Sequence, residues 1–318
     1  MDNSLVIFDL DGTLIDTIGD LSAAVEYALS EGGFPGHSVE EYRAMVGHGI
    51  RNLVIRALPE GASDEVIELS LSRFLEYYTS HIDVLSRPYP GIRDLLRELS
   101  DSDVKLAVTS NKFQAGTETL IRRFFPDIPF AKILGNAPGL PLKPDPEVVR
   151  LAMDAAFAGF NAARPDPVFA GFNAARLDPA LAGSPPARGR VHSRVALRLR
   201  SGLAAAEYGR CAVAQPETGA EEARSIPATI YPDRARSAGR RNRALPPHDS
   251  ERYSGGFVVL VGDSATDIRT ARNAGIGAIG VSWGFRPKAD LMEADVVVDT
   301  VDQLREVLLR ETDNLNTD

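Results

Sequence analysis

Short runs of apolar residues recur in two parts of the chain, at residues 4–9, 104–109, 257–262, 276–281 and 296–299. An uninterrupted apolar run of this length is typical of a strand buried on both faces of a parallel sheet. Between several of these runs, apolar residues recur with helical spacing, for example over 91–100 and 265–274. Strands alternating with helices predict an α/β fold with a doubly wound, Rossmann-like parallel sheet, in which ligands bind beyond the carboxyl ends of the strands.

The region between the first two apolar runs has a different pattern. Residues 17–86 contain four stretches with helical periodicity and no convincing strand, at 21–30, 39–46, 50–57 and 64–81. Four helices inserted after the first strand predict a small helical domain that covers the edge of the sheet as a cap. We therefore expect five segments: core at 1–16, helical cap at 17–86, core at 87–155, an insert at 156–255 and core at 256–318.

The insert differs in kind from the rest of the chain. Phe-Ala-Gly-Phe-Asn-Ala-Ala-Arg occurs at 157–164 and again at 169–176, and a tract rich in Arg, Pro and Ala without lysine follows. Residues 155–255 hold 15 Arg against 9 Asp plus Glu, a net charge of +6. Because the whole chain has a net charge of −9, the remaining residues carry about −15. This composition favours disorder. A nucleic-acid-binding arm is disfavoured because basic runs interleaved with aromatics are missing, and a sequence artefact or recent duplication stays open.

Overall composition limits the cellular setting. The chain has 318 residues, 44% of them hydrophobic, and a single cysteine, Cys211, which cannot form an intrachain disulfide. The N-terminus lacks the basic segment of a signal peptide, and no stretch approaches the roughly 18 uninterrupted apolar residues of a membrane span. We therefore expect a soluble protein of the reducing cytoplasm, a monomer or a homodimer, with no membrane or nucleic-acid partner.

Two acidic clusters follow apolar runs. Asp9 and Asp11 come directly after the first run, with Gly12 allowing a sharp turn, and they can share a hard cation while one carboxylate attacks an electrophile. Asp263 follows the run at 257–262, and Asp267 lies one helical turn later, so both can face the same cavity. A turn at Asp-Gly and helix capping by Asp263 or Ser264 are the structural alternatives, but capping alone does not require a second carboxylate one turn later.

So acidic a site needs positive charge before it can receive a phosphate. A divalent metal would supply part of this positive charge. Mg²⁺ prefers carboxylates, waters and phosphate oxygens as ligands, although Mn²⁺ accepts the same ligands. Ser110 and Asn111 follow the run at 104–109, where the Ser110 hydroxyl and nearby backbone N–H groups at an expected helix start can hold phosphate oxygens. Lys143, one of five lysines in the chain, precedes a predicted helix and is a further candidate.

The order Asp9-x-Asp11-Gly-Thr, Ser110, Lys143 and Gly262-Asp263-x-x-x-Asp267 resembles the haloacid dehalogenase-like hydrolase superfamily. The residues Val46-Gly47-His48-Gly49, the stretch from Ile133 to Pro146, the stretch after Gly262 and Val281-Ser-Trp283-Gly-Phe look most like phosphoglycolate phosphatases. The resemblance covers about 3–155 and 256–305 and leaves the insert unexplained. It implies a small phosphorylated metabolite as substrate. Asp11 also favours phosphate chemistry, because the dehalogenases of this superfamily carry another residue there.

The resemblance further implies a role for each motif. Asp9 would be the nucleophile that forms an aspartyl-phosphate, and Asp11 would protonate the leaving alkoxide and then activate water. Asp9, the backbone carbonyl of Asp11 and Asp263 would hold Mg²⁺. Ser110, Asn111 and Lys143 would bind the phosphoryl group, with Thr13 beside them, and Asp267 would position Lys143 or a metal-bound water. In the cap, His48 and Arg51 are candidates for contacting a substrate carboxylate.

Two other functions remain compatible with the sequence. A phosphomutase of the same superfamily uses the same four motifs but returns the phosphoryl group to a sugar instead of water. Alternatively, the insert between Lys143 and Asp263 disrupts the core, and the chain is an inactive homologue or an interaction protein. Because loop-closure entropy grows slowly with length, a surface insertion of about 100 residues is thermodynamically tolerable.

Overall fold

The computed structural model describes residues 4–158 and 256–315. The segment 156–255, for which the sequence predicts disorder, lies outside the described residues except at its first three positions.

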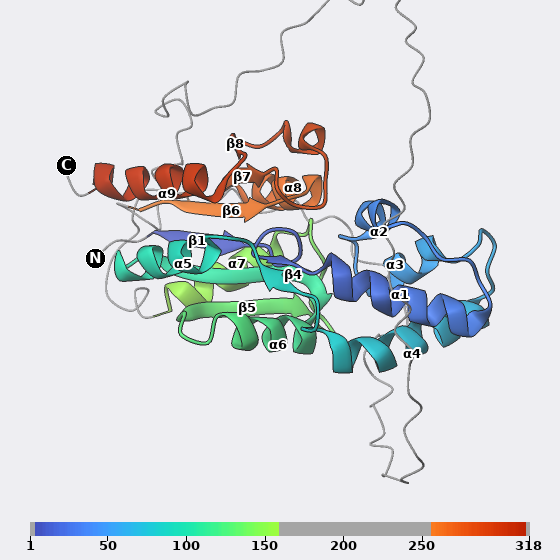
Figure 1. The fold of residues 1–318 in the computed structure, drawn as a ribbon. Coiled ribbons are helices and arrows are strands. Elements are labelled where there is room, and N and C mark those ends of the chain that lie inside the picture. Colours follow the sequence, from blue (N-terminus) through green and yellow to red (C-terminus); the bar gives the residue numbers. More distant parts are fainter. Residues whose placement is uncertain (1–3, 159–255, 316–318) are drawn as a thin grey trace, which may run out of the picture.

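A six-stranded parallel sheet forms the centre of the molecule, with the strand order β5-β4-β1-β6-β7-β8 (Figure 1). The strands are β1 (Leu5–Phe8), β4 (Lys105–Phe113), β5 (Phe130–Asn136), β6 (Val258–Gly262), β7 (Gly277–Val281) and β8 (Val296–Val298). In register, Phe8 lies opposite Val108 of β4 and Val261 of β6. The predicted doubly wound sheet is confirmed, and β1 lies where the strand order reverses, which is where such folds bind ligands.

Helices cover both faces of the sheet. Because successive side chains of a strand point to opposite faces, Val6 and Phe8 of β1 join one apolar cluster, and Leu5 and Ile7 join the other. The first cluster includes residues of α5 (Ile92–Asp101), α6 (Gln114–Phe124) and α9 (Val301–Leu315), and the second includes residues of α7 (Glu147–Ala156), α8 (Ala265–Ala274) and the 3₁₀ helix η3 (Lys288–Leu291). Burial on both faces explains why these strands are continuously apolar.

A cap of four helices lies beyond the carboxyl ends of the strands (Figure 1). It consists of α1 (Ile18–Gly32), α2 (Val39–Met45), α3 (Ile50–Ala57) and α4 (Asp64–His81). Ser38 begins α2 in a capping box with Glu41, and the Ser63 hydroxyl accepts a hydrogen bond from the backbone N–H of Val66 at the start of α4. Such capping satisfies N–H groups that a helix leaves without partners at its first turn.

Two chain segments connect the cap to the core, and they run side by side. They pair as short antiparallel strands, β2 (Ile15–Asp16) and β3 (Arg87–Pro88). The buried carboxylate of Asp20, at the start of α1, accepts hydrogen bonds from the backbone N–H groups of Leu85 and Ser86, both at 2.8 Å. The β2–β3 pair and the hydrogen bonds to Asp20 therefore hold the entry and exit of the cap together.

The sequence did not reveal every element. β5, α6, α9 and the β2–β3 pair were not predicted, and β4 extends to Phe113 instead of ending at 109. Ser110 and Asn111 consequently lie within the irregular last part of β4, not at a helix start, because α6 begins only at Gln114.

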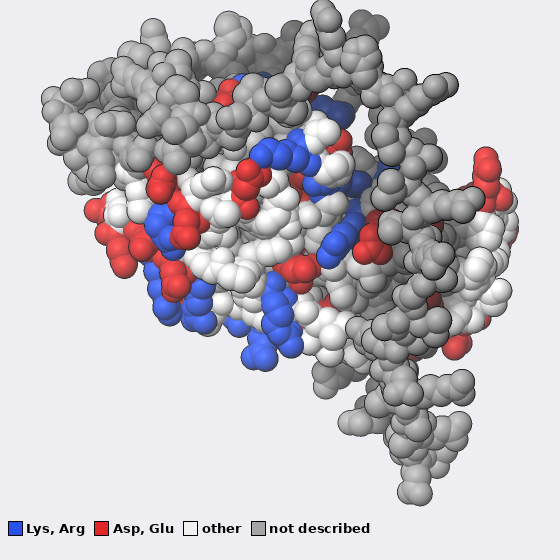
Figure 2. All heavy atoms as spheres, turned by 45° about the horizontal axis from the view of Figure 1, so that its top comes forward, with Lys and Arg blue, Asp and Glu red and all other residues white. Residues whose placement is uncertain are grey.

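None of the helices in the described ranges is both long and apolar enough to cross a membrane. On the face drawn in Figure 2, Lys and Arg side chains are interspersed with Asp and Glu side chains.

Candidate active site

The loop after β1 carries the first acidic cluster. Asp9 is held in line with β6 by a hydrogen bond of 2.9 Å from its backbone N–H to the carbonyl of Val261. Gly12 has φ +86°, which side chains rarely adopt, and a Cβ at this position would overlap the carboxylate of Asp263. The glycine therefore allows both the turn and the close approach of the two acidic loops.

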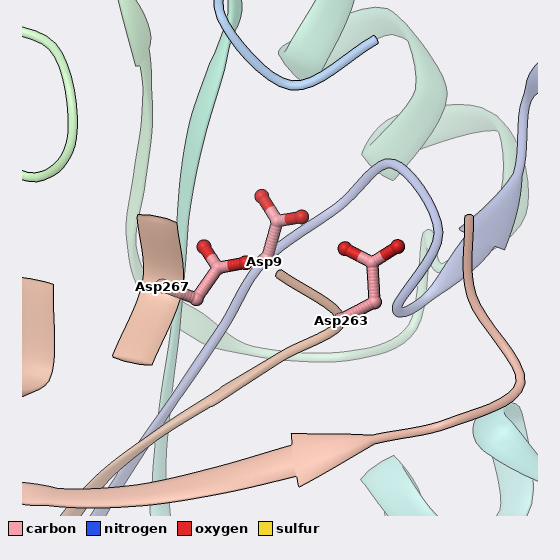
Figure 3. Close-up of side chains that lie close together, drawn as sticks. All are labelled: Asp9, Asp263 and Asp267. Atoms are coloured by element: carbon pink, nitrogen blue, oxygen red, sulfur yellow. The ribbon is translucent and has the colours of Figure 1, made fainter. Parts of the chain in front are cut away.

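Three carboxylates converge where these loops meet. Asp9 follows β1, Asp263 follows β6, and Asp267 belongs to the first turn of α8 (Figure 3). One oxygen of each lies within 4.8 Å of the others, and the three residues are only 7%, 3% and 1% exposed. Asp267 also completes a capping box with Ser264, so it serves helix and site together.

The ammonium of Lys143 lies among these carboxylates. Its Nζ donates to Oδ1 of Asp267 at 2.6 Å, to Oδ1 of Asp9 at 2.7 Å and to the backbone carbonyl of Thr109 at 2.8 Å. Although burial disfavours the charged amine, the carboxylates of Asp267 and Asp9 together hold the pKa of Lys143 above its ordinary value. Lys143 is therefore a fixed cation beside Asp9.

One ammonium does not balance three buried carboxylates. Burial, opposed by Lys143 and reinforced by Asp267, raises the pKa of Asp9 from 3.8 to about 7. Burial and the neighbouring charges of Asp9 and Asp267 likewise raise the pKa of Asp263 well above its ordinary range. A cluster of hard oxygen donors with excess negative charge fits a divalent cation such as Mg²⁺. Oδ2 of Asp263 already accepts a hydrogen bond of 2.6 Å from the Phe285 N–H, which orients the carboxylate.

Ser110 and Asn111 line the same pocket from the end of β4. The Asn111 side chain is occupied by the backbone: its Oδ1 accepts from the Lys143 N–H at 2.9 Å, and its Nδ2 donates to the carbonyl of Gly47 at 3.1 Å. Asn111 thus joins the Lys143 loop to the cap. The Ser110 hydroxyl accepts a longer hydrogen bond, 3.2 Å, from the Lys112 N–H.

Asp11 has partners that sequence reasoning missed. Its Oδ1 accepts hydrogen bonds from the Thr17 hydroxyl at 2.8 Å and from Nζ of Lys112 at 3.1 Å. Lys112, whose side chain is 1% exposed, also donates to the hydroxyl of Tyr78 on α4 at 2.6 Å. Burial and the charge of Asp11 raise the pKa of Tyr78, so it stays a neutral phenol. The Asp11 carboxylate is thereby held between core and cap. The only sequence signal was the position of Lys112 directly after Ser110 and Asn111.

The remaining predicted site residues lie outside the residues that line the pocket. Thr13 is fully buried, and its hydroxyl has no hydrogen-bond partner among the residues that the structure describes. Arg51 forms an ion pair with Glu68 on α4. His48 does not line the pocket, although its neighbours Gly47 and Gly49 do. The roles of all three stay predictions. On the cap side, the lining is apolar apart from Arg286, a core residue that was not singled out from the sequence.

The site and fold define a class of protein. The family of haloacid dehalogenase-like hydrolases matches residues 6–163, and a related HAD-hydrolase-like family matches residues 238–306. The chain belongs to the haloacid dehalogenase-like hydrolases, as the motif order indicated.

Particular relatives share this class. Over 158 residues the chain is 37% identical to phosphoglycolate phosphatase 1 of Pseudomonas aeruginosa, a match that covers 48% of this chain and 57% of the relative. It is 35% identical over 159 residues to a phosphoglycolate phosphatase of Mesorhizobium japonicum, covering 48% of this chain and 70% of the relative.

Solved structures share the fold. A crystal structure from Lactobacillus delbrueckii subsp. bulgaricus has a TM-score of 0.61 at 23% identity, covering 97% of this chain and 99% of that one. A haloacid dehalogenase-like family hydrolase from Streptococcus pneumoniae has a TM-score of 0.57 at 18% identity, covering 96% and 97%. At these identities the likeness concerns the fold alone.

Proposed function

We propose that this protein is a Mg²⁺-dependent phosphatase that hydrolyses a small phosphate monoester, with 2-phosphoglycolate as the first candidate substrate. The observation that carries the proposal is the placement of Asp9 in a pocket with Lys143 at 2.7 Å, Asp263 beside it and Ser110 at the end of the neighbouring strand β4. A nucleophile, a fixed cation and a hydroxyl donor around one space suit phosphoryl transfer. The names of the relatives support the choice of substrate.

In the first half of the reaction, an oxygen of Asp9 attacks the phosphorus and the bond from phosphorus to the ester oxygen breaks. The departing alkoxide takes a proton from Asp11, which lines the pocket close to Asp9. Lys143 and the Ser110 hydroxyl hold the phosphoryl oxygens, on which negative charge is concentrated during transfer. The products are an alcohol and an aspartyl-phosphate on Asp9.

In the second half, Asp11 accepts a proton from water, whose oxygen attacks the phosphorus. The bond from phosphorus to the Asp9 oxygen breaks, and inorganic phosphate leaves. Asp9, the backbone carbonyl of Asp11 and Asp263 are the groups that would hold Mg²⁺, which when bound neutralises charge on the carboxylates and phosphate. Asp267 keeps Lys143 directed at Asp9 through its hydrogen bond of 2.6 Å.

The test is release of inorganic phosphate from 2-phosphoglycolate and a panel of phosphate esters, with Mg²⁺ and with EDTA. Asp9→Asn should lower the rate by about 10³-fold or more, because the nucleophile is lost. Asp127→Asn is the matched control, since Asp127 is an exposed carboxylate paired with Arg97 away from the pocket. Acid quenching followed by peptide mass spectrometry should find the phosphoryl group on Asp9. A folded protein that releases phosphate from no ester would refute the proposal.

A further inference from the structure

Three cations line the pocket, and they differ in their partners. Lys112 is paired with Asp11, and Lys143 is paired with Asp9 and Asp267. In contrast, Arg286 has no carboxylate within salt-bridge distance among the side chains of residues 4–158 and 256–309. It is therefore the pocket cation whose charge is not already matched by the described part of the protein.

Arg286 is held at the seam between core and cap. It directly follows Phe285, whose N–H donates to Asp263 at 2.6 Å, so its backbone is anchored beside the carboxylate cluster. Its side chain reaches the cap, where Nη1 donates to the carbonyl of Ala44 at 2.7 Å and Nη2 donates to that of Val46. A guanidinium has five N–H donors, so these two bonds leave others available to a ligand.

The surroundings of Arg286 disfavour its charge. Burial, with a contribution from Arg56, lowers the pKa of Arg286, and Asp263 opposes this effect only in part. Burial and the charges of Arg56 and Arg286 also lower the pKa of the nearby His48. An anionic ligand would stabilise the charge of a half-buried guanidinium that is bonded only to neutral carbonyls. A carboxylate suits this purpose because its two oxygens match the paired N–H donors of a guanidinium.

The cap residues that line the pocket offer an anion no charged side chain. Their side chains are apolar, among them Leu21, Val46, Ile50 and Leu53. Arg51, the cap arginine that the sequence suggested, is already paired with Glu68 and does not line the pocket. A substrate whose phosphate lies over Asp9 would therefore share the pocket with one cation that is not paired with a described carboxylate.

We propose that Arg286 binds a carboxylate at the far end of the substrate and so selects small phosphate esters that carry a second anionic group. This inference rests on the proposed phosphatase function. The phosphate is held by the core, whereas the carboxylate is held by a guanidinium that is itself fixed to both the core and the cap. Specificity then depends on Arg286 and not on Arg51.

The test compares two esters of similar size, 2-phosphoglycolate and 2-hydroxyethyl phosphate, which differ in having a carboxylate or a neutral hydroxyl at the far end. The wild-type protein should have a kcat/KM at least about 30-fold higher for 2-phosphoglycolate. Arg286→Met should reduce this ratio to near one, mainly through KM, and Arg286→Lys should retain part of it. Arg122→Met is the control, because Arg122 is an exposed arginine paired with Glu118 on α6.

The outcomes separate the two proposals. Hydrolysis of both esters by the wild type at equal kcat/KM would leave the phosphatase function standing and overturn the role of Arg286, whether or not the variants fold. A ratio that survives Arg286→Met, even with both rates lowered, would also overturn it, because Arg286 would then only hold the cap. Loss of the ratio in Arg51→Met instead would assign the carboxylate to Arg51. Hydrolysis of neither ester by a protein that hydrolyses other esters of the panel would overturn the role of Arg286, and release of phosphate from no ester at all would refute the function itself.

Discussion

Replacing Asp9 should make the metal-free protein more stable at neutral pH, although it removes the proposed nucleophile. Asp9 shares a buried space with Asp263 and Asp267, and only Lys143 offsets their charge. The pKa of Asp9 is raised from 3.8 to about 7, so ionising it in the folded state costs about 4 kcal/mol relative to the unfolded chain. Asn at this position is neutral and avoids that cost.

The sign of the pH dependence follows from the direction of the shift. Between pH 3.8 and about 7 the folded protein keeps the Asp9 proton and the unfolded chain has lost it. The folded state therefore binds more protons, and stability falls as pH rises through this window, by up to about 1.4 kcal/mol per unit. Above pH 7 the free energy of unfolding of metal-free Asp9→Asn should exceed that of the wild type by a few kcal/mol. Near pH 4 this difference should disappear.

Urea denaturation in EDTA at several pH values measures this difference, and repeating it with Mg²⁺ tests the cause. Saturating Mg²⁺ at 100 times its Kd should stabilise the wild type by about 2.7 kcal/mol and the variant by less, because a ligand and a charge are gone. Asp127→Asn should behave oppositely. Hydrogen bonding by Arg97 lowers the pKa of Asp127 to about 2, so its removal costs stability at neutral pH. A difference between Asp9→Asn and the wild type that is constant from pH 4 to 8 would refute the reasoning.

Three further substitutions test the geometry around the site. Gly12→Ala places a Cβ against the carboxylate of Asp263 on a backbone with φ +86°, so we expect a loss of at least about 1 kcal/mol of stability and weaker activation by Mg²⁺ in titrations of activity. An unchanged Mg²⁺ titration would contradict this. Lys112→Met leaves Asp11 without its ammonium partner. Hydrolysis of 2-phosphoglycolate, whose leaving group needs a proton, should therefore slow about 10²-fold more than hydrolysis of p-nitrophenyl phosphate. Tyr78→Phe removes one hydrogen bond to Lys112 and should have a smaller effect in the same direction; equal losses on both esters would indicate a purely structural role.

Much of the fold could be predicted from local pattern. Strands buried on both faces have continuous apolar runs. The cap helices predicted at 50–57 and 64–81 coincide with α3 and α4 because helical periodicity is a local signal, to which α4 adds the capping residue Ser63. β5 could not be recognised in the same way, since Lys132 interrupts its apolar pattern and both Ala131 and Lys132 are exposed. The β2–β3 pair has two residues on each side, too few for any periodicity to appear.

The acidic residues of the candidate site were predictable because parallel strands bring their carboxyl ends to one edge of the sheet. Asp9 and Asp263 follow neighbouring strands, and their convergence is a consequence of strand order alone. The motif order suggested that Lys143 belongs to the site. Its hydrogen bonds to Asp9 and Asp267, however, depend on a loop that Asn111 holds in place.

What the sequence by itself determined is the class of fold and the carboxylates at its strand ends, because both follow from periodicity and from the position of polar residues directly after apolar runs. Only the tertiary structure decided which arginine lines the pocket. Arg51 and Arg286 are both arginines beside short loops, and nothing local distinguishes them. Arg51 meets Glu68 across two cap helices, while Arg286 reaches from the core to the cap without an acidic partner in the described chain. Charge pairing of this kind depends on contacts between residues distant in sequence, which local pattern does not encode.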